Sequence, residues 1–120
     1  AQSQHQPNTF NYMFNFKCPL FNGDLGCPHS IEIPFVFNTL TATGIPDFIG
    51  KGPKIESLSE KVMDAWIAFA HTGNPNHESL PAWSSYDIEK RATMFLGEEC
   101  EIVNAVFDKE REAWNGLLEI

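Results

Sequence analysis

Residues Phe10 to Lys17, with the sequence FNYMFNFK, alternate strictly between two kinds of side chain. One set is aromatic throughout and comprises Phe10, Tyr12, Phe14 and Phe16. A period of two with aromatic side chains predicts a β-strand that buries one face. A strand needs neighbours for its backbone groups, and no hairpin partner is found nearby. The segment that follows, residues 18–28, contains two prolines and two glycines and is predicted to be a loop.

Two later segments carry helical patterns. From Ser57 to Thr72 apolar side chains recur at helical spacing, Ser57 and Glu60 have the spacing of a capping box, and Gly73 supplies a stop signal. We therefore predict an amphipathic helix from Ser57 to Thr72. A second helix is predicted from Asp108 to Leu118, with Asp108 as its N-terminal cap.

The remaining elements are short. We predict strands at Ala92–Gly97 and Cys100–Val106, and a short helix or turn at Ser30–Leu40 that Pro34 interrupts early. These pieces do not close a sheet, and the loops between them are long for a self-sufficient domain of 120 residues. The sequence therefore predicts the α/β class, as part of a larger body whose sheet is incomplete in this chain.

Composition narrows the classes of partner. The formal net charge is −8 and the pI about 4.8, with no basic run, which disfavours binding to nucleic acid or to anionic membranes. The apolar runs are only a few residues long, so no membrane span is expected. Three cysteines permit at most one disulfide, for which Cys18 and Cys27 are candidates, although free thiols are favoured. Residues 1–9 are polar and are expected to be a flexible lead-in to residues 10–120.

His29 is the candidate for chemistry, because it lies on a loop after the predicted strand. Sites in α/β folds lie beyond the carboxyl ends of strands, and imidazole titrates near neutrality, so it can take a proton from a serine. The chain contains no GxSxG nucleophile elbow and no HGGG-type oxyanion loop. From the local residues, a packed structural histidine remains the commoner alternative. A metal site at Cys27, His29 and Glu32 is disfavoured, because their spacing is not that of structural zinc ligands.

The other polar candidates have plainer interpretations. Glu32 is an acid that orients His29, a structural carboxylate in the first turn of a short helix, or a substrate contact. His71 complements the dipole in the last turn of its helix. His5 and His77 are expected to be solvated, and Trp66 and Phe69 are expected to be core residues.

The stretch LGCPHSIEIPFVFNTL resembles the histidine block of the type-B carboxylesterases, the cholinesterase-like branch of the α/β-hydrolases. The family pattern is roughly Gly-x-x-His-x-x-Glu-hydrophobic-Pro-Phe-Val-Phe, and residues 26–37 fill it. Further segments resemble the family and occur in the family's order: YMFNFKCP, MDAWIAFAHTGNPN, LPAWSSYD, RATMFLGEEC and REAWNG. The resemblance therefore covers roughly residues 10–117.

This resemblance implies a function. His29 would be the triad histidine of a carboxylic ester hydrolase, acting first as general base and then as general acid. The serine nucleophile, the triad acid and the oxyanion loop would lie upstream, in an N-terminal remainder of the same fold. The chain would then be the C-terminal portion of the catalytic domain, inactive when isolated. Its substrate would be a small carboxylic ester, and no metal or organic cofactor would be needed.

A second function stays open. Some cholinesterase-like proteins resemble enzymes yet work in adhesion, so the chain is alternatively part of a non-catalytic interaction module. In either case we expect the aromatic face of Phe10–Phe16 to lose much of its cover and the strand edges to be open, so that the isolated chain is poorly folded or self-associates.

Overall fold

The computed structural model describes residues 2–117, within which three strands form one sheet in the order β1-β2-β3. Strand β1 (Tyr12–Phe14) pairs in parallel with β2 (Thr93–Leu96), and β2 pairs in antiparallel with β3 (Glu101–Val103). Two further backbone bonds, Met94 N to Asn11 O at 3.0 Å and Asn15 N to Leu96 O at 2.9 Å, extend the β1–β2 ladder at both ends. The three predicted strands are therefore present, with narrower bounds, and the partner of β1 comes from the far end of the chain.

The longest element is helix α3 (Pro53–Thr72). It begins four residues before the predicted start, with Gly52 as its N-cap and proline in its first turn, where the fixed φ of proline suits a helix. Ser57 therefore lies inside the helix, and the predicted capping box is wrong. The predicted end is confirmed, since Gly73 has a φ of 74° and its N–H donates to Phe69 O at 2.8 Å.

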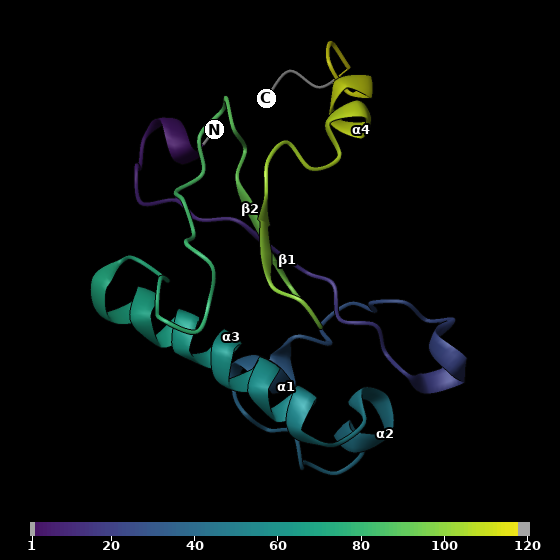
Figure 1. Ribbon diagram of the computed structural model, residues 1–120. Helices are drawn as coiled ribbons and strands as arrows, with labels where there is room; N and C mark the ends of the chain where they lie inside the picture. The colour runs from purple at the N-terminus through teal and green to yellow at the C-terminus, as the bar shows by residue number, and fades with distance from the viewer. Residues whose placement is uncertain (1, 118–120) are drawn as a thin grey trace.

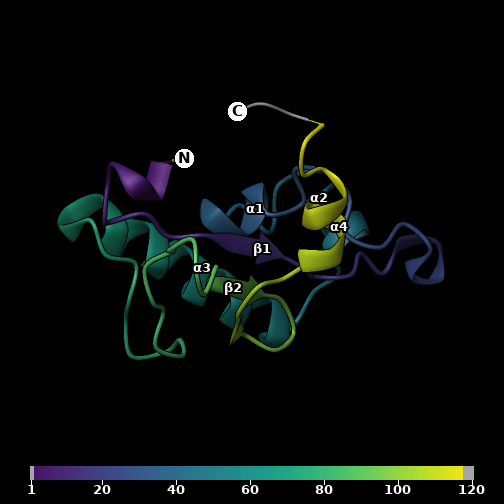
Figure 2. The same cartoon turned by 90° about the horizontal axis from the view of Figure 1, so that it is seen from above.

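Short helical elements occupy the segments around α3. Pro34 does not interrupt a helix: it lies in the first turn of α1 (Ile33–Val36), where its missing N–H costs nothing. Helix α2 (Ile45–Ile49) follows, and single 3-10 turns, η1 and η2, occupy Gln2–Gln4 and Leu20–Gly23. Figure 1 shows α1, α2 and α3 gathered at one end of the strands and α4 (Asp108–Ala113) at the other; Figure 2 gives the view from above.

The C-terminal helix differs from its prediction. Its N-cap is Phe107, with a φ of 55°, so Asp108 does not cap it. Asp108 instead forms ion pairs with Arg91 at 2.7 Å and Arg111 at 2.9 Å. The side-chain hydrogen bond from Arg111 and, next, the charges of Arg91 and Arg111 hold the pKa of Asp108 below its usual range. The helix ends at Ala113, and Leu118 of the predicted range lies outside the described residues.

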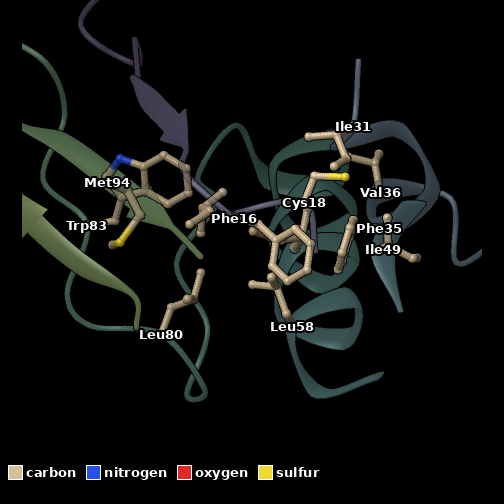
Figure 3. Close-up of a cluster of buried hydrophobic side chains, with 13 residues drawn as sticks. Phe16, Cys18, Ile31, Phe35, Val36, Ile49, Leu58, Leu80, Trp83 and Met94 are labelled. Atoms are coloured by element: carbon tan, nitrogen blue, oxygen red, sulfur yellow. The ribbon is translucent and has the colours of Figure 1, made fainter. Parts of the chain in front are cut away.

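The core lies where the aromatic face of β1 meets α1 and α3 (Figure 3). Ring pairs connect the three elements: Phe10 with Phe69 at 6.2 Å, Tyr12 with Trp66 at 6.4 Å and Phe14 with Phe35 at 5.1 Å between centroids. The expectation that this face would lose much of its cover holds only in part: Phe16 is buried, while Phe10, Tyr12 and Phe14 pack against the core but stay half-buried. The outer sides of Trp66 and Phe69 stay exposed, at 48% and 44%, so these two residues are only in part the core residues that their spacing indicates.

Three smaller predictions have clear outcomes. All three cysteines, which lie in the described part, are free thiols, as favoured. His77 is half-buried rather than solvated: its Nε2 lies 3.0 Å from Lys61 O, and its Nδ1 lies 3.4 Å from Ser79 N, so the loop after α3 is attached to that helix. Among residues 2–117, no helix is long and apolar enough to cross a membrane.

Candidate active site

The loop after β1 returns His29 to the carboxyl end of that strand. Beyond β1, Phe16 and Cys18 enter the core, and residues 19–25 leave it. The loop is closed at its base by the bond from Cys18 N to Gly26 O, at 2.8 Å. The Cys27 thiol then donates to the carbonyl of Phe14, the last residue of β1, at 3.1 Å. His29 therefore sits two residues from a direct contact with the end of a parallel strand.

His29 occupies the second position of a tight turn. The N–H of Ile31 donates to Pro28 O at 3.3 Å, which closes the turn, and Ser30 has a φ of 66° while His29 does not have a positive φ. A turn with a negative φ and then a positive φ at its two central positions is of type II. Buried side chains of Ile31 and Phe35 anchor the chain that follows, so an exposed imidazole stands on a fixed support.

The imidazole of His29 has no partner in the part of the chain that is described. No hydrogen bond, ion pair or ring contact joins it to any residue of 2–117. In particular, no bond links it to Glu32, so the structure does not bring together the histidine and the nearby acid as an orienting pair. Among residues 2–117, therefore, the structure shows neither a nucleophile nor an orienting acid in contact with His29.

Glu32 acts through its charge on groups at β1 and at the loop that follows it. It is half-buried at the N-cap of α1, and its side chain makes no capping hydrogen bond there. Burial and, next, the charge of Glu32 raise the pKa of the Tyr12 hydroxyl; a hydrogen bond with Trp66 offsets this in part. The same two causes raise the pKa of the Cys27 thiol, with a further contribution from Cys18. The charge of Glu32 therefore acts on a residue of β1 and on Cys27.

The remaining candidates are not gathered around His29. His71 lies in the last turn of α3 and is exposed, as its position indicates, and His5 is exposed after η1. Within residues 2–117, no three side chains of histidine, cysteine, aspartate or glutamate lie close enough together to hold a metal ion. Sequence reasoning missed the turn type at Ser30. The sequence carries no signal for this turn, because serine is not a residue that favours the positive φ found at this position.

Comparison with known proteins gives the family. The model of the Carboxylesterase family matches residues 1–114. Among curated proteins, the chain is 39% identical over 90 residues to phenmedipham hydrolase of Pseudarthrobacter oxydans, covering 73% of this chain and 18% of that protein. It is 36% identical over 117 residues to liver carboxylesterase of Sus scrofa, covering 92% of this chain and 19% of that protein.

Solved structures agree. A carboxylesterase from Geobacillus stearothermophilus superimposes with a TM-score of 0.74 at 33% identity, over 88% of this chain and 21% of that chain. A PNB esterase superimposes with a TM-score of 0.72 at 31% identity, over 86% of this chain and 20% of that chain. The fold is therefore part of an α/β-hydrolase, and the chain belongs to the carboxylesterase family. It spans about a fifth of the length of these relatives.

Proposed function

We propose that this chain supplies the general base, His29, of a carboxylic ester hydrolase that works through an acyl-serine intermediate. One observation carries the proposal: in a chain of the carboxylesterase family, the histidine stands exposed on a type II turn held at the carboxyl end of a parallel strand. That is where α/β folds place reactive groups.

The chemistry assigns His29 one proton uptake and one proton return in each of two steps. Its imidazole takes the proton of a serine hydroxyl as the serine oxygen attacks the ester carbonyl, and gives that proton to the departing alcohol. It then takes a proton from water as the water oxygen attacks the acyl-serine, and gives that proton to the serine oxygen as the carboxylic acid leaves. The serine, the orienting acid and the oxyanion donors belong, in this proposal, to a remainder of the same fold that precedes residues 10–120.

The edge of β1 is the proposed junction with that remainder. Within residues 2–117, β1 has a pairing partner on one side, β2, and lies at the edge of the sheet on its other side. A further parallel strand would satisfy the backbone groups of this edge. We place the missing strands of the sheet there, which also brings their carboxyl ends toward the turn of His29.

The decisive experiment compares two histidine variants in the protein expressed from its own gene, with a short-chain chromogenic carboxylic ester as substrate. His29→Gln is expected to lower kcat by about 10³-fold, within the ~10²–10⁴ that a general acid–base group contributes. His71→Gln is the matched control, since His71 is an exposed histidine on α3, and its kcat should be unchanged.

Two outcomes would reject the proposal. Equal activity of His29→Gln and the wild type would mean that His29 is not the base. Absence of ester turnover in a folded wild-type protein would favour the non-catalytic interaction module, for which the exposed apolar residues of α3, Trp66, Ile67 and Phe69, offer a contact surface.

A further inference from the structure

A cavity of about 520 Å³ opens at the carboxyl ends of the two parallel strands β1 and β2. Phe16 and Lys17, just after β1, line one side, and Gly97 and Glu98, just after β2, line another. The link between α2 and α3 and the first turns of α3 complete the wall. Ligands of α/β folds bind at this edge of the sheet, and the volume is that of a small-molecule site.

The lining of this cavity is basic although the chain is acidic. Four lysines from three segments contribute to it: Lys17, Lys51, Lys54 and Lys61. They are half of the eight Lys and Arg residues of a chain with a net charge of −8. Glu98 is the acidic residue of the lining. Within the described residues none of the four lysines forms an ion pair, and Glu98 alone offsets their charge in the lining.

The start of α3 adds its dipole to the positive potential, although the carboxylate of Glu56 also lies in its first turn. Its N-cap, Gly52, has no side chain that could accept a bond from the first-turn amides. Twenty residues of helix point the positive end of their dipole toward Lys51 and Lys54. The hydroxyl of Ser57 also lines the cavity and can donate a hydrogen bond.

The charge of the lining also indicates that this cavity stays open in the complete protein. The exposed apolar side chains of α3, such as Ile67, suit burial against other protein elements. Burial of ammonium groups that have no partner is costly, so a surface that carries four of them is a poor interface for the rest of a fold. A small anion, by contrast, would neutralise them.

We propose that this cavity binds a small polyvalent oxyanion, a molecule that carries carboxylate or phosphate groups. Lys17, Lys51, Lys54 and Lys61 supply the charge, and Ser57 and the first turn of α3 supply hydrogen-bond donors. This site is distinct from the turn of His29, and it does not depend on ester hydrolysis.

The test is isothermal titration calorimetry of the protein, expressed from its own gene, with inorganic pyrophosphate and, separately, with citrate. Sodium chloride at matched ionic strength controls for screening. We expect saturable binding of at least one anion, and pyrophosphate and citrate separate a phosphate preference from a carboxylate preference. The double variant Lys51→Gln/Lys54→Gln should bind about tenfold more weakly or worse, because two charge-assisted contacts are lost.

Matched variants make the result specific. Lys90→Gln/Lys109→Gln removes two exposed charges outside the lining and should leave the affinity within about twofold, because these charges are screened by solvent. Glu98→Gln removes the opposing carboxylate and should tighten binding, a gain that a misfolded variant cannot produce. No saturable binding of either anion, an equal loss in both double variants, or an equal effect of chloride would overturn the proposal.

Discussion

At Ser30 the backbone adopts a conformation that an L side chain tolerates poorly. Its φ of 66° lets the chain turn directly after His29, and this turn aims the exposed imidazole. The sequence indicated His29 by its loop position and Glu32 by its distance of three residues. It could not indicate that the charge of Glu32 would act on Tyr12 and Cys27, because that depends on where the turn places α1 relative to the strand.

Ser30→Gly should raise the free energy of unfolding by about 0.5–1 kcal/mol. An L residue in the left-handed region costs ~1–2 kcal/mol, which glycine would relieve. The larger conformational entropy of glycine in the unfolded chain offsets part of this stabilisation. Urea denaturation measures the change, and Ser30→Val should destabilise, because a β-branched residue fits this φ worse. A glycine variant less stable than the wild type would show that the serine side chain makes a contribution larger than the backbone strain.

At the scale of elements, α3 shows where pattern reading succeeds and where it fails. Its apolar spacing and its glycine stop predicted the body and the end of the helix, because both are local properties of the chain. Its start was wrong, since a serine and a glutamate three residues apart also occur inside helices. Ser59 is the serine that matters for packing: it is fully buried, and its hydroxyl donates to Phe35 O at 2.8 Å, which joins α3 to α1.

A pair of serine variants tests this assignment. Ser59→Ala should lower the free energy of unfolding by about 1 kcal/mol, the usual contribution of one hydrogen bond. Ser57→Ala should change stability by no more than ~0.5 kcal/mol, because Ser57 is exposed within the helix. Chemical denaturation of both variants gives the comparison. A larger loss for Ser57→Ala than for Ser59→Ala would restore the capping role that the sequence pattern indicated.

At the scale of the whole molecule, the chain has a core but also wide apolar exposure. Large hydrophobic side chains with more than two-fifths of their surface exposed occur on α1, α3 and near α4, among them Phe37, Ile67 and Phe107. In the described residues the outer edge of β1 is also open for pairing. Both features belong to surfaces that another part of a fold would cover, in agreement with a span of about a fifth of the relatives.

The 120 residues produced as an isolated chain should therefore self-associate and show no ester turnover. Edge pairing and contact between apolar faces drive the association, and the absence of a GxSxG elbow removes the nucleophile. Size-exclusion chromatography with light scattering should give a mass that rises with concentration. Ile67→Lys adds a charge to the exposed face of α3 and should lower the mass measured at a given concentration. A monomer with a sharp cooperative melt, or turnover by this chain, would contradict the expectation.

The sequence by itself determined the α/β class, the alternating strand at β1, most of α3 and the position of His29 on a loop. Each of these follows from periodicity or turn residues within some twenty positions. The tertiary structure decided the pairing of β1 with a strand some eighty residues later and the cover of its aromatic face by α3. It also decided which groups the charge of Glu32 acts on and the gathering of four lysines into one cavity. These features depend on contacts between residues far apart in the chain, and local propensity carries no information about which distant segments meet.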